Sequence, residues 1–175
     1  MKKITCGLLL FSFLLMGCSN SSPFLSRPID TNLSLWITEE VDEDSLSSMT
    51  YLPGGFGMDL YLDSSYEAID NGDGTYRAPD VHVIYQISAY PDYSDGGSYV
   101  TYISITDPAI NVYGLSLSSS QEDVSVKMTL LGFTHQCQEC SGLQEYWTKN
   151  NCAFTFNEYS ITIGASISNR DHLVF

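Results

Sequence analysis

One histidine and three cysteines near the C-terminus are the residue types from which zinc, redox and disulfide sites are built. Cys137 and Cys140 have CxxC spacing, His135 lies just before them, and Cys152 follows in the next stretch. Thiolate and imidazole groups at such a spacing are typical zinc ligands. A redox pair is a second interpretation, but that motif normally opens a helix in a βαβ unit, which the surrounding sequence does not predict.

Other residues capable of catalysis do not form a diagnostic set. His82 falls on the polar side of an expected strand, and His172 lies near the C-terminus. The sequence contains no G-x-S-x-G elbow and no glycine-rich phosphate loop. With 21 Asp and Glu residues, no single carboxylate pair is diagnostic of glycoside hydrolysis. We therefore predict no catalytic residues and no metal or cofactor. The alternative is a small exported hydrolase or a redox or metal protein that uses His135, Cys137, Cys140 and Cys152.

The N-terminus is typical of an export signal. Lys2 and Lys3 are followed by an apolar run over residues 4–16, which is too short to span a bilayer. The run ends in Leu15-Met16-Gly17-Cys18, which resembles the lipobox of bacterial lipoproteins. In that family a small residue such as Gly17 lets a peptidase cut before the cysteine, and the Cys18 thiol receives a diacylglyceryl group.

The lipoprotein resemblance implies where the chain lies in the cell. Residues 1–17 are removed as the signal peptide, and the Cys18 amine receives an acyl chain in many bacteria. We expect a domain on the extracytoplasmic side of the bacterial cell membrane or outer membrane, held there by the lipid. Export also favours a disulfide from Cys137 or Cys140 to Cys152, since that compartment can be oxidising. Free thiols and a metal site with His135 are the less favoured interpretations.

The composition excludes some partners and leaves others. The net charge is −14 and the signal contains Lys2 and Lys3, so the mature chain has a charge of −16. Such a chain repels phosphate backbones, which argues against nucleic-acid binding. We expect a non-catalytic interaction module that contacts an envelope protein or a glycan. Tyrosine suits such contacts, and the predicted binding surface consists of Tyr90, Tyr93, Tyr99 and Tyr102.

The elements that position these residues are mainly strands. Alternation predicts strands at residues 33–37, 56–62, 81–89, 99–106, 153–156 and 159–167, with strand-like character at 110–117 and a further strand from Phe133. Asn71-Gly72 and Asp73-Gly74 are strong turn signals. The acidic segment 39–48 is expected to be an exposed loop. Ser119 followed by Glu122 has capping-box spacing, and an apolar stripe predicts one helix at about 119–131.

The predicted fold class is α+β, with a mainly antiparallel sheet that has one dry and one wet face. We expect a lipid-anchored tether over residues 18–32 and a single exported domain over 33–175. Residues 103–113 can be aligned without gaps on 165–175, with three identities, among them Ser104 with Ser166. This alignment suggests two similar β-rich halves, 33–117 and 118–175.

Overall fold

The computed structural model describes residues 25–54, 58–89, 97–136 and 145–165. Its elements, in chain order, are α1 (Glu43–Ser48), β1 (Thr50–Pro53), β2 (Asp59–Leu62), β3 (Ile69–Asp70), β4 (Tyr76–Arg77), β5 (Val83–Ala89), β6 (Ser98–Ile105), α2 (Gln121–Leu130), β7 (Thr134–His135), β8 (Glu145–Lys149), β9 (Cys152–Phe156) and β10 (Ile161–Ala165).

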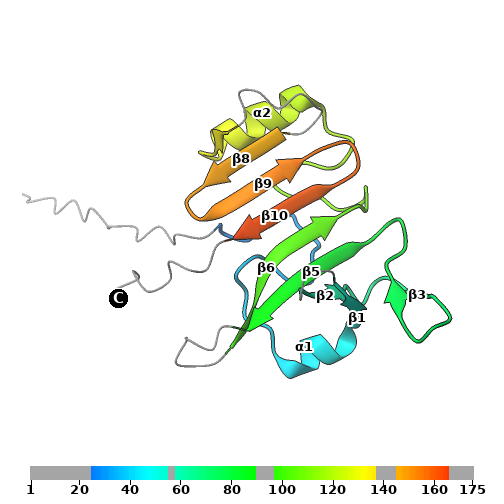
Figure 1. Ribbon diagram of the computed structural model, residues 1–175. Coiled ribbons are helices and arrows are strands. Elements are labelled where there is room, and N and C mark those ends of the chain that lie inside the picture. The colour runs from blue at the N-terminus through cyan, green and yellow to red at the C-terminus, as the bar shows by residue number, and fades with distance from the viewer. Residues whose placement is uncertain (1–24, 55–57, 90–96, 137–144, 166–175) are drawn as a thin grey trace, which may run out of the picture.

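Eight of these strands form one antiparallel sheet in the order β1-β2-β5-β6-β10-β9-β8-β7, and β3 pairs with β4 in a separate hairpin (Figure 1). The prediction of a mainly antiparallel sheet with one longer helix is confirmed. The fold is richer in sheet than the α+β expectation implied, because α1 is short and no residue of it is buried.

The order of elements repeats along the chain. A helix precedes β1, β2, β5 and β6, and a second helix precedes β7, β8, β9 and β10. Within the sheet, both sets of four strands run from an outer edge inward, so that β6 and β10 meet in the middle. Their pairing is antiparallel, with Ile103 opposite Ile163. The β3–β4 hairpin is an addition to the first set, between β2 and β5.

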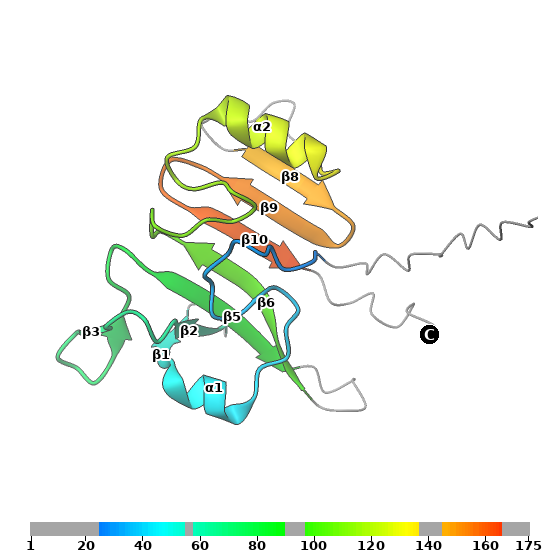
Figure 2. The ribbon, with the colours of Figure 1, turned by 180° about the vertical axis from the view of Figure 1, so that it is seen from behind.

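One face of the sheet, here called the inner face, carries the hydrophobic core. Its strands contribute large apolar side chains that are almost fully buried, among them Val83, Ile103, Phe154, Ile161 and Ile163. The segment before α1 crosses this face, as does the connection between β6 and α2 (Figure 2). The dry face that alternation predicted is therefore covered mainly by irregular chain.

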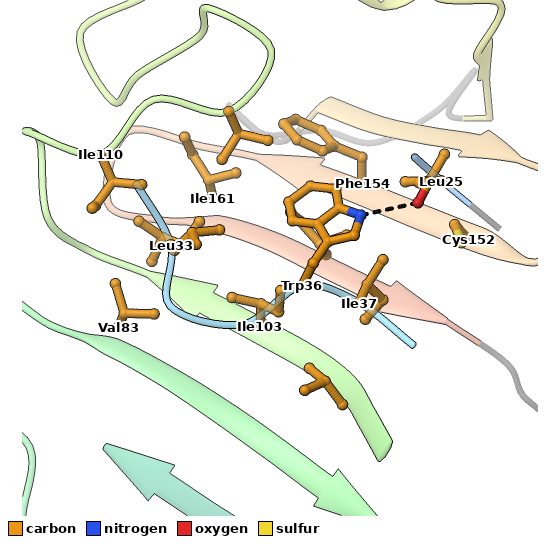
Figure 3. Close-up of a cluster of buried hydrophobic side chains, with 14 of the residues drawn as sticks. Leu25, Leu33, Trp36, Ile37, Val83, Ile103, Ile110, Cys152, Phe154 and Ile161 are labelled. Atoms are coloured by element: carbon orange, nitrogen blue, oxygen red, sulfur yellow. Dashed lines mark hydrogen bonds between the residues drawn. The ribbon is translucent and has the colours of Figure 1, made fainter. Parts of the chain in front are cut away.

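The N-terminal segment is fixed to the inner face by Trp36. The Trp36 indole Nε1 donates a hydrogen bond to the Leu25 carbonyl at 2.9 Å, and both side chains are buried (Figure 3). The core therefore includes Leu25, which lies within the segment that we expected to be tether. Residues 33–37, which we expected to form a strand, belong to no strand, but Leu33 and Ile37 lie in the core.

A buried carboxylate joins this segment to the sheet. Asp63 is 3% exposed and accepts hydrogen bonds from the Tyr85 hydroxyl at 3.0 Å and from the Ser65 amide at 2.9 Å. Burial by itself raises the pKa of Asp63, but hydrogen bonds from Ser34, Ser65 and Tyr85 outweigh it and leave this pKa below its ordinary value. The Tyr85 hydroxyl in turn accepts from the Leu35 amide.

Helix α2 agrees with its prediction, to within one or two residues at each end. The capping box is formed by Ser120 and Asp123, one residue later than the predicted Ser119 and Glu122, and the Ser120 side chain accepts from the Asp123 amide. Val124 and Met128 are fully buried on the inner face. After the helix, Gly132 has a φ of +80°, a conformation in which a side chain is strained.

Three local expectations were wrong. Segment 39–48 contains α1, because Asp42 caps it by accepting from the Ser45 amide at 2.8 Å. The connection at 110–117 forms turns closed by a bridge between Val112 and Leu115, not a strand. Strand β8 was not predicted at all. The turn predicted around Asn71 is confirmed by the β3–β4 hairpin.

Candidate functional site

The opposite face of the sheet, here called the outer face, is not crossed by any described segment in the view of Figure 1. Directly opposed residues of antiparallel strands share a face, so the register places ten residues of β5, β6, β10, β9 and β8 on it in two rows. The rows are Ile84–Ser104–Thr162–Thr155–Tyr146 and Gln86–Tyr102–Gly164–Ala153–Thr148. Leu62 and Leu60 of β2 continue these rows beyond Ile84 and Gln86.

None of the ten outer-face residues is charged at neutral pH, although 16% of the chain is Asp, Glu, Lys or Arg. Tyr146 is 38% exposed, and the other nine are half-buried. Ser104, Thr162 and Thr155 form a line of hydroxyls across three neighbouring strands. A partner that covers this surface need not remove an ion from water, which is the costliest part of burying polar groups.

Tyr102 lies at the centre of the second row, between Gln86 and Gly164. A Cβ atom added at Gly164 would lie 3.8 Å from the Tyr102 ring, so this tyrosine lies over the glycine. Tyr102 thus lies on the outer face, and its part in a binding surface stays a prediction. Tyr99 is not, because it is only 2% exposed and cannot offer a contact surface. The other two tyrosines, Tyr90 and Tyr93, lie outside the described residues.

The structure does not bring His135 and Cys152 together. His135 on β7 is opposite Trp147 on β8, which is opposite Phe154 on β9, and Cys152 lies two residues further along β9. Two strand spacings and two residues along a strand amount to roughly 12 Å. A single zinc ion held by both residues is therefore excluded. Among the described residues, no group of three metal-ligating side chains converges.

Cys152 is a free thiol buried near Leu25 in the core of the structure, and the disulfide expected from it to Cys137 or Cys140 stays a prediction. Burial raises the pKa of this thiol, which keeps it neutral and makes it a poor nucleophile. The partners considered for it, Cys137 and Cys140, lie outside the described residues. The inward direction of Cys152 follows from its parity with Phe154 and Phe156, which are also buried.

His135 contacts a carboxylate that the sequence had not singled out. Its Nε2 lies 2.9 Å from Glu145 Oε2, and the Gln121 side-chain amide donates to Glu145 Oε1. The His135 ring also packs on Trp147, with centroids 4.7 Å apart. A carboxylate that orients a histidine is one part of a general-base site. Among the described residues, however, no hydroxyl or thiol hydrogen-bonds to His135, so the pair lacks a placed nucleophile.

A cavity of about 400 Å³ lies beside this pair, between the start of α2 and strands β7 and β8. Glu145 is 8% exposed, and both of its oxygens have partners. The arrangement satisfies a buried carboxylate and fixes α2 against the sheet edge. Glu145 belongs to no sequence motif, and its contact with His135 gave no signal in the sequence because it depends on the β7–β8 register.

Gly17 and Cys18 lie outside the described residues. No helix in the described part of the chain is long and apolar enough to cross a membrane. The chain matches no protein-family model, no curated protein and no solved structure.

Proposed function

We propose that this chain is a lipid-anchored, extracytoplasmic and non-catalytic binding module whose outer face contacts a partner protein. The observation that carries this proposal is the run of ten uncharged residues across five strands of an otherwise strongly acidic chain. Cores of protein–protein interfaces are depleted of charged residues and enriched in tyrosine. Tyr102 and Tyr146 are the anchors that such an interface would use.

The anchor part of the proposal rests on Cys18 and on how close it lies to the folded domain. Leu25 is packed in the core, and seven Cα–Cα spacings separate it from the lipidated cysteine, a reach of at most about 25 Å. An acidic domain is repelled by anionic headgroups, so the lipid is the attachment. Leu25 lies on the inner face, which leaves the outer face turned away from the point where the tether joins.

The repeated order of elements supports the interpretation of two similar halves, 33–117 and 118–175. Each half would then contribute one helix and four strands of the main sheet, and the first half would carry the β3–β4 hairpin in addition. The outer face spans the junction of the halves, because Ser104 and Tyr102 come from β6 while Thr162 and Gly164 come from β10. Residues of both halves therefore form the proposed contact surface.

The anchor is tested by replacing its cysteine. We expect Cys18→Ala to release the domain into the soluble fraction, because neither an apolar span nor a basic patch remains to hold it. Membrane fractionation with an antibody to the folded domain measures this. Retention of the variant in membranes after a high-salt wash would contradict the lipobox interpretation.

The contact surface is tested by site-specific photo-crosslinking in the intact membrane. A photoreactive amino acid at Thr155 or Thr162 should give one discrete adduct with a second protein. The same residue at Ser47, an exposed position on α1, should not give that adduct. An adduct of equal yield from Ser47, or none from either outer-face position, would contradict the proposed placement.

A further inference from the structure

A groove of about 1000 Å³ lies at the β1 edge of the sheet, away from the ten outer-face residues. Three segments form its walls: the end of α1 with β1, the chain at residues 64–68 after β2, and the β3–β4 hairpin at residues 74–76. Its size is at the upper end of the range for ligand-binding clefts. This groove is not lined by any residue to which a function has been assigned above.

Three tyrosines line the groove, and two of them are unusually exposed for large side chains. Tyr51 is 51% exposed and Tyr76 is 44% exposed, while Tyr66 is half-buried. The Tyr51 ring contacts Tyr61 edge to face, with centroids 5.6 Å apart. The Tyr66 hydroxyl donates to Asp107 at 2.8 Å. Two of the rings are therefore held in place before any ligand arrives, which lowers the entropy cost of binding.

The third ring is positioned by the turn of the hairpin. The Asn71 amide donates to the Thr75 carbonyl at 3.0 Å, and the Asp73 carboxylate accepts from the Thr75 amide at 2.9 Å. Gly74 has a φ of +86°, a conformation that the turn requires and that L side chains rarely adopt. These hydrogen bonds fix the turn, and Tyr76, which follows it, lies at the groove.

The remaining lining defines the ligand chemistry. Neutral hydroxyls from Ser64, Ser65 and Thr75 alternate with the aromatic rings, and Glu67 is the single charged side chain among the described lining residues. Thr75 Oγ1 already donates to Asp73 and accepts from Asn71, but a wholly apolar ligand would cover a hydroxyl such as that of Ser64 without offering it a partner. An anionic ligand would be repelled by Glu67 and by the net charge of −14. The groove instead matches a ligand that has both C–H surfaces and hydroxyls.

We propose that this groove binds a neutral or amino-substituted oligosaccharide, which is stacked on Tyr51 and Tyr76 and hydrogen-bonded by the hydroxyls and Glu67. An extended peptide added to β1 fits less well. The strand has only four residues and ends in Pro53, which has no N–H to donate, and both features protect sheet edges from pairing. This site is separate from the outer face and does not depend on the partner proposed there.

The test uses three trisaccharides that differ in charge: the triamine of chitosan, triacetylchitotriose and trigalacturonate. Calorimetry on the purified full-length protein in detergent should show the cationic or the neutral sugar binding with a Kd of about 1 mM or tighter. Trigalacturonate should not bind. If neither of the first two sugars binds, or if trigalacturonate binds as tightly as they do, the proposal is overturned.

Variants then locate the site. We expect Tyr76→Ala to weaken sugar binding about tenfold and Glu67→Gln to weaken the triamine more than triacetylchitotriose. Tyr159→Ala is the matched control, because Tyr159 is 74% exposed and does not line the groove. Unchanged melting temperatures show that the variants fold. Sugar binding that is insensitive to Tyr76→Ala would overturn the proposal. The proposal would also be overturned if a pentalysine peptide bound more tightly than the sugars and if Tyr76→Ala abolished that peptide binding.

Discussion

The inner and outer faces of the sheet come from the same strands but differ in what their side chains do. On β9, Phe154 is fully buried while the adjacent Thr155 is half-exposed, and on β10 Ile163 is fully buried beside the half-exposed Thr162. The inner face satisfies the need for a core. None of the ten outer-face residues is fully buried, although the fully buried Leu62 of β2 lies on the same side of the sheet. Their lack of charge is therefore the feature that calls for a functional explanation. We therefore expect that, along one strand, substitutions of inner-face residues change stability and substitutions of outer-face residues change binding.

The largest difference is expected between Phe154 and its neighbour. Phe154→Ala should lower the free energy of unfolding by about 3–5 kcal/mol, because it leaves a cavity in the core. Thr155→Ala should change it by less than about 1 kcal/mol, since Thr155 is on the outer face. Denaturant titration measures both values. Equal losses would show that the outer face is also part of a packed core.

Helix α2 gives the next contrast. Met128 is fully buried against the inner face, whereas Leu130 is 79% exposed. Met128→Ala should cost about 2–5 kcal/mol of unfolding free energy, and Leu130→Ala should cost only a few tenths. If the two variants were equally stable, α2 would not be a fixed part of the inner layer.

A pH titration probes the link between the N-terminal segment and the inner face. Hydrogen bonds hold the pKa of Asp63 below its ordinary value in the folded state. Its stabilising contribution is therefore present above about pH 4 and is lost as the pH falls through the folded-state pKa. Asp63→Asn should cost about 1–3 kcal/mol at pH 7, and its deficit relative to the wild type should shrink below pH 4. A deficit that stays constant down to pH 2 would contradict this.

The smallest effect is expected on the outer face itself. A Cβ at Gly164 would meet the Tyr102 ring at 3.8 Å, an ordinary van der Waals contact. Gly164→Ala should therefore be neutral or stabilise the fold by about 0.5 kcal/mol, because glycine loses more chain entropy on folding. Thermal unfolding detects such a shift. A loss of more than about 1 kcal/mol would mean that this spot is already tightly packed.

The sequence predicted most of what depends on local pattern. The strands that contain Tyr85, Ile103 and Ile163, and the helix that contains Met128, were placed within one or two residues, because their periodicity is set by which side chains are buried. The assignment of Tyr102 to the wet face follows from the same alternation. Helix α1 was missed because it buries nothing and so leaves no apolar stripe.

Features that depend on pairing between separate segments could not be predicted from the sequence. The contact of His135 with Glu145 depends on the register between β7 and β8, and the connection between these strands is longer than a tight turn. The separation of His135 from Cys152 follows from the order of three strands. Tyr99 is buried because it bridges to Glu40 in the segment before α1 and its ring lies close to Gly97, contacts that no local pattern predicts.

The most direct test of the outer face as a contact surface is to place one charge on it. Thr162→Lys should reduce binding of the crosslinked partner protein at least about 100-fold, because the ammonium would be buried without a counter-ion. Ser47→Lys, the matched hydroxyl-to-lysine change on α1, should bind as the wild type does. Both variants should unfold within about 1 kcal/mol of the wild type. Unchanged partner binding by Thr162→Lys would contradict the account.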